Sequence, residues 1–421
     1  MHEMKDSGIE WLGEIPSGWD VIRIKDKYTF DTGFTPDTKH SEYYTDEYGF
    51  EWVTIADVKN DRVASPTKST ISREYVKNNY KKQMPAGCLL YSFKLSVGET
   101  AITDRPLFTN EAIACFYPSK DININFFKYS SFLIEYNANT NIYGAKILNQ
   151  QLINNAYVVF PPLEIQKSIA NFLDQKCSEI NSLSADIQSQ IDILEEYKKS
   201  VITEAVTKGL NPDVKMKDSG TKWLGLIPET WDISKISNVY TLRNTKVSDF
   251  DYPPLSVTMK GVVPQLETAA KTNAHDDRKL VKKGDFAINS RSDRRGSCGI
   301  ADRDGSVSLI NTILCPKGEM NPRYYNWLFH TVEFADEFYA NGHGIVDDLW
   351  TTGWQEMKRI WIPMPPLDVQ QEIANHLDKK CAEIDAIIAS KKAQLETLAE
   401  YKKSLIYEYV TGKKEVPSNE F

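Results

Sequence analysis

The chain of 421 residues carries 50 basic and 58 acidic side chains, a net charge of −8, and 41% hydrophobic residues. This composition excludes a mostly disordered or fibrous protein, and the length suggests about three folded units. No apolar run approaches the roughly 20 residues that a membrane span needs, the N-terminus lacks a signal peptide, and the six cysteines form no Cys-x-x-Cys pair. We therefore expect a cytoplasmic protein with free thiols.

The chain contains an internal duplication. Residues 5–24 read KDSGIEWLGEIPSGWDVIRI, residues 217–236 read KDSGTKWLGLIPETWDISKI, and 12 of these 20 positions agree. The 47-residue segments that begin at Pro161 and Pro365 agree at 25 positions. Two copies of this kind suit a molecule with a pseudo-two-fold axis. We divide the chain into a first domain (1–160), a first helix (161–209), a second domain (210–364) and a second helix with a C-terminal tail (365–421).

The first domain has the pattern of a mixed α/β fold. Short β-branched or aromatic runs at 51–55, 88–91 and 156–160 predict strands, and a helix is expected over 125–136. Between Lys59 and Lys94 there are eight basic and two acidic residues, so a local positive face can exist on an acidic protein. Taken alone, the count is better explained by a solvated lysine-rich surface.

The sequence predicts one long coiled-coil helix in each of the segments 161–209 and 365–411. Apolar residues recur every seven positions, with Leu183, Ile191, Tyr197 and Ala205 widening the first stripe and Lys391 interrupting the second. A length of about 45 residues corresponds to roughly 65–70 Å of helix. We expect the two helices to pair antiparallel, with double prolines at their starts and Gly209 and Gly412 after their ends. The seam residues are Leu173, Ile180, Ile187, Leu194, Val201, Leu377, Ile384, Leu398 and Leu405.

The second domain repeats parts of the first. Residues 282–291 align with 85–94, so that a glycine turn leads into a strand that ends in a polar residue and then a base. A helix is expected over 322–339, and nine basic and five acidic residues lie between Lys271 and Arg303. Arginine suits bidentate contact with guanine or phosphate, and asparagine suits adenine. A charged surface loop held by Asp293 is an equally good explanation of the arginine-rich segment.

These patterns give a set of candidate DNA contacts. In the first domain the candidates lie before the 88–91 strand and near its end. In the second domain they lie at the end of the equivalent strand and after it, and Asn110 is aligned to Asn311. The candidates are Lys81, Lys82, Ser92, Lys94, Asn110, Asn289, Arg291, Ser292, Arg294, Arg295 and Asn311.

No catalytic constellation is present in the sequence. It has no Walker A segment, no Gly-x-Gly-x-x-Gly that opens a helix, no His-Glu-x-x-His, no Gly-x-Ser-x-Gly and no methylase Asn/Asp-Pro-Pro-aromatic motif. We therefore expect neither a catalytic residue nor a metal site in this chain.

The repeated motifs resemble those of the specificity subunits of type I restriction–modification systems. The resemblance covers essentially the whole chain and is carried by PPLEIQKSIANFLD and PPLDVQQEIANHLD, by the EYKKS helix ends and by the doubled WLG-x-IP-x-x-W segments. Thr32–Pro36 followed by Trp52–Asp57 resembles the family's target-recognition domain, whereas the second domain lacks such a Gly-x-Thr-Pro loop.

The resemblance implies an α+β fold: two globular target-recognition domains separated by two long helices that pair as an antiparallel coiled coil. Each domain would read one half of a split, asymmetric site in double-stranded DNA, as a non-catalytic subunit of a phage-defence complex. The helices would fix the half-site spacing, near one helical turn of about 34–36 Å, and dock two methyltransferase subunits. A motor/nuclease subunit would join them, and S-adenosylmethionine, ATP and magnesium would belong to these partners.

Three alternatives remain open from the sequence. A specificity subunit of a related system that is not type I would have the same layout, and neighbouring genes would distinguish it. A self-contained nuclease or methylase would need a site without the usual motifs. A coiled-coil adaptor without a DNA role would need no basic segments.

Overall fold

The computed structural model describes residues 3–44, 49–59, 62–94, 96–141, 144–267, 275–344 and 350–417. The chain divides into two compact units, the first formed by Met1–Asp186 with Gln394–Phe421 and the second by Ile187–Ala393. Each unit therefore contains one globular domain and a part of both long helices. Among the described residues, no helix is both long and apolar enough to cross a membrane.

The first domain is built on a four-stranded antiparallel sheet of order β10-β9-β12-β4. Alternate residues of β9 face two cores: Leu89 and Tyr91 pack with Phe126 and Phe127 of helix α3, and Leu90 packs in a second cluster. The sheet is thus buried on both faces, which explains its continuous apolar strands. The bounds are Thr100–Ile102 (β10), Leu89–Ser92 (β9), Ile113–Phe116 (β12), Phe30–Thr32 (β4) and Ile124–Ser130 (α3).

A second, three-stranded sheet of order β11-β5-β8 completes the first domain, and β11 runs parallel to β5. Its strands are Phe108–Thr109 (β11), Phe50–Val53 (β5) and Ser69–Ile71 (β8). The other elements are β1 (Met4–Asp6), β2 (Glu14–Pro16), β3 (Asp20–Arg23), α1 (Ile24–Lys27), β6 (Val58–Lys59), β7 (Arg62–Val63), α2 (Arg73–Asn78), β13 (Asn139–Thr140), β14 (Lys146–Ile147), α4 (Gln150–Asn155), β15 (Tyr157–Phe160) and three 3-10 helices (Ser41–Tyr43, Ile55–Asp57, Ser131–Asn137).

The second domain repeats the four-stranded sheet with the equivalent order β25-β24-β27-β19. Its three-stranded sheet, β20-β23-β26, differs because all its strands are antiparallel. The bounds are β16 (Met216–Asp218), β17 (Leu226–Pro228), β18 (Asp232–Lys235), α6 (Ile236–Val239), β19 (Tyr240–Arg243), β20 (Lys246–Val247), β21 (Leu255–Thr258), β22 (Gly261–Pro264), β23 (Arg278–Val281), β24 (Phe286–Asn289), a 3-10 helix (Ser292–Arg294), β25 (Cys298–Ile300), β26 (Gly305–Ser308), β27 (Asn311–Pro316), α7 (Pro322–Phe329), α8 (Val332–Ala340), α9 (Trp354–Met357) and β28 (Trp361–Met364).

The predicted domain helices are present but interrupted. In the first domain, α3 continues only as the 3-10 helix Ser131–Asn137, and the Ser131 hydroxyl donates to the Lys128 carbonyl at 2.9 Å. Such local hydroxyl bonds compete with the helical ladder. In the second domain the expected helix is two helices, because the Thr331 hydroxyl caps the start of α8 by accepting from Phe334 N at 3.2 Å.

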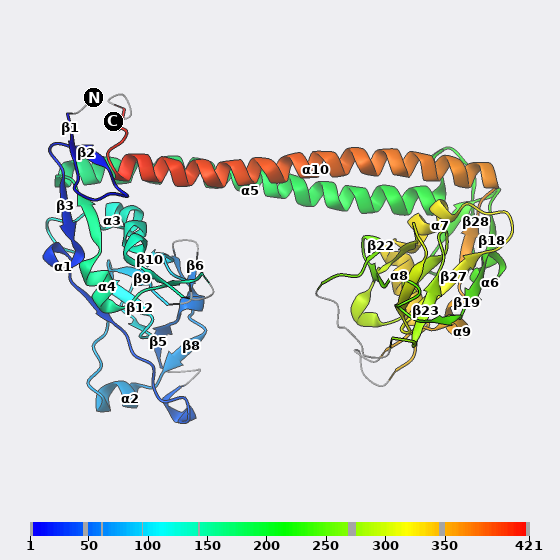
Figure 1. The fold of residues 1–421 in the computed structure, drawn as a ribbon, viewed down its shortest axis with the longest axis horizontal. Coiled ribbons are helices and arrows are strands. Elements are labelled where there is room, and N and C mark those ends of the chain that lie inside the picture. Colours follow the sequence, from blue (N-terminus) through cyan, green and yellow to red (C-terminus); the bar gives the residue numbers. More distant parts are fainter. Residues whose placement is uncertain are drawn as a thin grey trace. The chain divides into compact units, whose positions relative to one another are not determined.

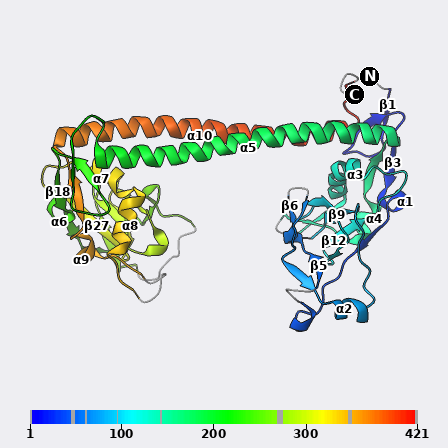
Figure 2. The ribbon, with the colours of Figure 1, turned by 180° about the vertical axis from the view of Figure 1, so that it is seen from behind.

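The two predicted long helices are confirmed. Helix α5 (Leu163–Lys208, 46 residues) and helix α10 (Leu367–Val410, 44 residues) each begin directly after a double proline. Gly209 and Gly412 follow their ends with φ of +82° and +72°. At 1.5 Å per residue the helices are about 69 and 66 Å long. Figure 1 and Figure 2 show the helices lying side by side.

The helices pair antiparallel, as predicted. In the first unit Lys402 donates to Asn181 at 2.9 Å. In the second unit Lys198 contacts both carboxylate oxygens of Asp385 at 2.7 Å, and Lys391, which interrupts the apolar stripe, donates to Gln190. As residue numbers rise along α5, the partners' numbers fall along α10, which fixes the direction of pairing.

The buried seam is narrower than we predicted. Leu183 and Tyr197, which the sequence placed on the stripe, are 48% and 47% exposed, whereas Ile191 and Ala205 are buried. A helix that packs against a single partner buries mainly the two seam positions of each heptad. The apolar residues beside the seam therefore stay exposed to solvent. Among the predicted seam residues, Leu173, Ile180, Ile187, Leu377, Ile384 and Leu405 are buried, and Leu194, Val201 and Leu398 are partly buried.

A glutamine attaches each long helix to its domain in the same way. Gln166 donates to the Pro161 carbonyl at 2.8 Å and accepts from Asn123 N at 2.9 Å. Gln370 makes the same two contacts, with Pro365 and Asn321, at the same distances. The duplication seen in the sequence is therefore preserved at the level of individual hydrogen bonds.

Candidate nucleic-acid interface

The loop after β4 organises the exposed polar residues of the first domain. A Cβ atom at Gly33 would lie 1.8 Å from the Thr109 carbonyl oxygen, so only glycine fits there. Phe34 N donates to that same carbonyl at 2.9 Å, and Trp52 Nε1 donates to the Phe34 carbonyl at 2.9 Å. The Thr32–Pro36 segment is thus fixed against the end of β11.

Lys81 and Lys82 lie beside this loop. The Lys81 ammonium is 4.6 Å from the centre of the Phe34 ring, and that of Lys82 is 4.7 Å from the Tyr117 ring and 3.5 Å from Asp31. Each lysine ammonium therefore lies against an aromatic ring while its charge stays accessible to solvent. A hollow of about 380 Å³ opens between the lysines and the loop.

Tyr80 is a functional candidate that the sequence analysis missed. Its side chain is 94% exposed, and it is the one non-glycine residue with a positive φ (+49°) among those the structure describes. The turn is held by hydrogen bonds from Asn79 N to the Tyr75 carbonyl (3.0 Å) and from Lys81 N to the Val76 carbonyl (3.1 Å). An exposed ring next to two lysines suits stacking on nucleic acid. The sequence signal was the run Asn-Tyr-Lys-Lys after a short helix.

Lys94 follows strand β9 and is linked to the Thr32–Pro36 segment through Glu111. Its ammonium is 3.8 Å from Glu111, which also accepts a hydrogen bond from Thr35. The Thr35 hydrogen bond, and more weakly the Lys94 charge, lower the pKa of Glu111, so this carboxylate stays charged beside Lys94. The half-buried Asn110 accepts from Ala112 N at 3.2 Å and stabilises the turn.

The three arginines of the arginine-rich loop in the second domain differ in their contacts. Arg291 N donates to Asn289 Oδ1 at 3.1 Å and its main chain forms an antiparallel bridge with Thr351, but its guanidinium has no partner among the described residues. Arg294 is exposed, 3.5 Å from Asp293. Arg295 is engaged, because it pairs with Asp336 and lies 5.5 Å from the centre of the Tyr339 ring.

Ser292 lies in this loop beside Arg291. Its main-chain N donates to the Trp350 carbonyl at 3.1 Å, so a second segment fixes the loop. The Arg291 side chain is therefore presented from an anchored main chain, which is the arrangement that base readout requires.

Three of the proposed contacts are corrected by their burial. Ser92 is fully buried, and Asn289 and Asn311 are 7% and 4% exposed. The two asparagines lie opposite each other in the β24–β27 register, and the Asn311 amide donates to the Ser308 carbonyl at 3.1 Å. These side chains hold strand ends together and do not face solvent in this conformation, so they are not available as DNA contacts.

The alignment of Asn110 with Asn311 is also wrong. Ser92 pairs with Ile113 across β9 and β12, and its counterpart Asn289 pairs with Asn311. The structural equivalent of Asn311 is therefore Ile113, since the turns that precede the two strands differ in length.

The basic segment of the second domain does not form one exposed face. Arg278 is buried and donates to the Ser306 hydroxyl at 2.8 Å, and burial lowers its pKa. Lys279 donates to the Asn311 carbonyl at 2.7 Å, and burial lowers its pKa as well. Lys271 lies outside the described residues. The accessible positive charge of this segment is thus divided between Lys282 and Lys283, Arg303, and the loop that begins at the partly exposed Arg291.

The described part of the chain holds no cluster of three or more His, Cys, Asp or Glu side chains arranged to bind a metal ion. All six cysteines are described and carry free thiols.

Comparison with known proteins gives consistent matches. A family model described as "Type I restriction modification DNA specificity domain" matches residues 16–192 and 228–397. The chain is 22% identical to the type I restriction enzyme EcoBI specificity subunit of Escherichia coli, over 91% of this chain and 84% of that one.

Solved structures share the fold. A chain from a study of complex assembly and conformational transition of the type I R-M system superposes with a TM-score of 0.68 at 14% identity, covering 95% of this chain and 99% of that one. The crystal structure of the HsdS subunit from Thermoanaerobacter tengcongensis gives a TM-score of 0.53 at 14% identity, covering 95% and 98%.

Proposed function

The chain belongs to the family of type I restriction modification DNA specificity domains and acts in DNA recognition; we propose that each of its two domains reads one half of a split, asymmetric site. The observation that carries this proposal is the pair of equivalent four-stranded sheets. Two positions after the equivalent strands β9 and β24 the side chains differ, Lys94 in one domain and Arg291 in the other. The same scaffold with different contact residues is suited to two different half-sites.

In this proposal Arg291 reads a base edge and the lysines of the first domain hold phosphates. Arginine has the fork geometry that recognises guanine O6 and N7, and the Arg291 guanidinium gives up no contact with a described residue on binding. Lys81 and Lys82 are point charges beside an exposed ring, which suits the DNA backbone. Local charges of this kind act within a Debye length of about 8–10 Å, so a net charge of −8 does not oppose them.

We also propose that the helix pair sets the spacing of the half-sites and docks two methyltransferase subunits, with a motor/nuclease subunit joining for restriction. Exposed apolar side chains on both helices support a docking role, among them Ile193, Tyr197, Ile387 and Tyr401. In this proposal the chain is non-catalytic, and S-adenosylmethionine, ATP and magnesium belong to the partner subunits.

The experiment is to co-express the chain with the methyltransferase encoded beside it and to map methylated bases in host DNA by long-read sequencing. The proposal predicts one motif made of two different half-sites separated by a fixed spacer. An assembled complex that methylates a single continuous motif, or none, would contradict it.

A further inference from the structure

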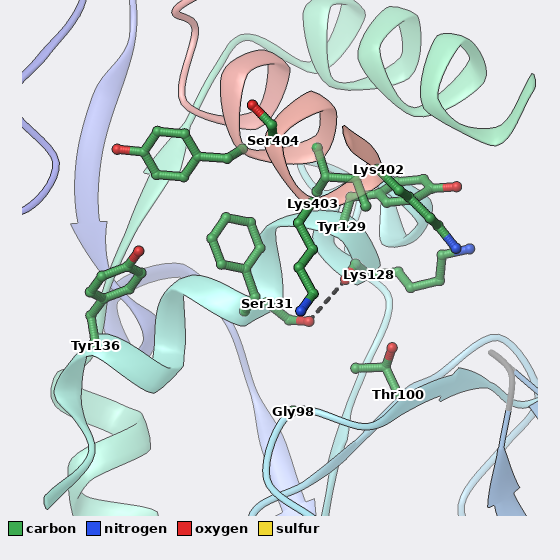
Figure 3. Close-up of a pocket in the computed structure, with 12 residues that line it drawn as sticks. Gly98, Thr100, Lys128, Tyr129, Ser131, Tyr136, Lys402, Lys403 and Ser404 are labelled. Atoms are coloured by element: carbon green, nitrogen blue, oxygen red, sulfur yellow. Dashed lines mark hydrogen bonds between the residues drawn. The ribbon is translucent and has the colours of Figure 1, made fainter. Parts of the chain in front are cut away.

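The first unit contains a cavity of about 580 Å³ between α3, the 3-10 helix that follows it and the C-terminal part of α10 (Figure 3). The rings of Phe132, Tyr136 and Tyr407 line it, together with Lys402 and Lys403 of α10. None of these residues belongs to the DNA-reading candidates. The cavity combines apolar surface with positive charge, a pairing that the proposed function leaves unexplained.

In the second unit, helix α8 contacts the equivalent part of the long helix through an acidic residue. Thr203 of α5 donates to the Glu333 carboxylate of α8 at 3.0 Å. The next residue, Phe334, packs edge-on against Trp223 with ring centres 5.9 Å apart. A carboxylate followed by an aromatic residue of the same chain thus contacts α5 and Trp223 at this corner.

The first unit has the equivalent carboxylate, Glu135, but it lies beside Gly98 at the cavity wall and pairs with Lys146 instead of reaching the long helix. The aligned helices place Tyr407 where the second unit has Thr203. Tyr136 stacks on Trp11 at 4.2 Å, as Phe334 packs on Trp223 in the other copy. Glu135 precedes Tyr136 in the chain, and its carboxylate lies 2.7 Å from the Lys146 ammonium.

The open corner is also more basic than its counterpart. Among the described residues, neither Lys402 nor Lys403 has a carboxylate partner, and Lys402 donates only to the neutral Asn181. Their counterparts Lys198 and Lys199 are neutralised by Asp385 and by Glu196, both within 2.7 Å.

Lys128 also lines the cavity, but its charge is balanced by Asp174 of α5 at 3.7 Å; the residue at the equivalent place in α7 is the neutral Asn326. The equivalence follows from Tyr129 and Trp327, the next residues, which donate to matching aspartates of the long helices, Asp174 at 2.7 Å and Asp378 at 2.9 Å.

We propose that this cavity is the docking site for an acidic segment of a partner polypeptide, in which a carboxylate meets Lys402 and Lys403 and a neighbouring apolar side chain lies on Tyr407 and Phe132. Glu333 and Phe334 are the nearest counterpart in the second unit, where the carboxylate accepts from the Thr203 hydroxyl and the ring packs against Trp223. The inference rests on the proposed function, because it takes the methyltransferase subunit as the partner. Charge complementarity selects an acidic segment over a basic or purely apolar one.

The test measures the affinity of the purified methyltransferase subunit for the full-length chain by isothermal titration calorimetry at low and high salt. Lys403→Glu is expected to weaken binding about tenfold or more, with a smaller difference at high salt. Tyr407→Thr, which copies the second unit, is expected to weaken it as well. The matched control is Lys199→Glu, the equivalent exposed position outside the cavity, which should change affinity less than about twofold.

The outcomes separate the possible failures. Wild-type assembly that neither Lys403→Glu nor Tyr407→Thr weakens would overturn the docking site and leave the proposed function intact. A wild-type chain that fails to bind the methyltransferase would reject both. ATP is titrated in parallel: if Lys403→Glu abolished ATP binding and left the methyltransferase affinity unchanged, the cavity would belong to a nucleotide and the proposal would be wrong.

Discussion

The main chain of Arg291 pairs with that of Thr351 across an antiparallel bridge, while its guanidinium meets no partner among the described residues. The anchored backbone and the free side chain together predict that Arg291→Ala weakens DNA binding without loss of fold. If Arg291 reads a base, the loss should be about 1–3 kcal/mol with relaxed specificity at one position. If it contacts a phosphate, the slope of log affinity against log salt concentration should instead decrease in magnitude by about one. Titration of the assembled complex with its target at several salt concentrations measures both.

Arg295→Ala is the matched control in the same loop. Its guanidinium holds Asp336 of α8 and lies over Tyr339, so this substitution should affect the melting temperature more than DNA affinity. If Arg291→Ala left binding and salt dependence unchanged, the loop would not be a reader.

Tyr80→Gly should separate DNA binding from stability. The ring is 94% exposed and the backbone is left-handed, so glycine removes strain of about 1–3 kcal/mol at the cost of its greater unfolded-state entropy. We expect an unchanged or slightly higher free energy of unfolding, measured in urea, together with weaker DNA binding by the complex. Full DNA affinity in this variant would remove Tyr80 from the interface.

Gly33→Ala tests the role of the loop after β4. The added Cβ would collide with the main chain of Thr109, which cannot move without displacing β11, and overpacking of this kind costs about 1–3 kcal/mol. Gly18→Ala is the control, since no atom lies within 4 Å of its Cβ position. We expect thermal unfolding at lower temperature and weaker DNA binding for Gly33→Ala only. Equal melting temperatures for the two variants would show that the loop tolerates displacement.

Ile187→Pro should disrupt assembly with the methyltransferase. Ile187 is 7% exposed in the seam, and proline inside a helix costs about 3 kcal/mol or more because it removes a main-chain hydrogen bond and clashes with the preceding turn. Ser189→Ala, two residues away on the exposed side, should leave the helix intact. Size-exclusion chromatography of the co-expressed subunits is the readout, and normal assembly of the proline variant would contradict a docking role for the helices.

The long helices and the duplication could be predicted because their signals are local. The double prolines, the seven-residue spacing of Leu173, Ile180 and Ile187, and the glycines after each helix all lie within one segment. The antiparallel direction followed from the pseudo-symmetry alone.

The residues of the interface were harder to predict because their roles depend on burial. Asn289 and Arg291 are two residues apart, yet Asn289 is buried, whereas Arg291 is partly exposed and its guanidinium has no partner among the described residues. Tyr80 resembles an ordinary surface aromatic in the sequence, and its strained turn is visible only in the fold. The cavity beside Tyr407 joins segments that are about 270 residues apart in the chain, which no local pattern reveals.

The central claim is that each domain reads its own half-site. The most direct measurement replaces residues 210–364 by the corresponding domain of a relative with a different target and maps DNA methylation by the reassembled complex. We predict that one half of the motif changes, while the other half and the spacer are retained. A motif that is unchanged, or altered in both halves, would contradict the division of the site between the two domains.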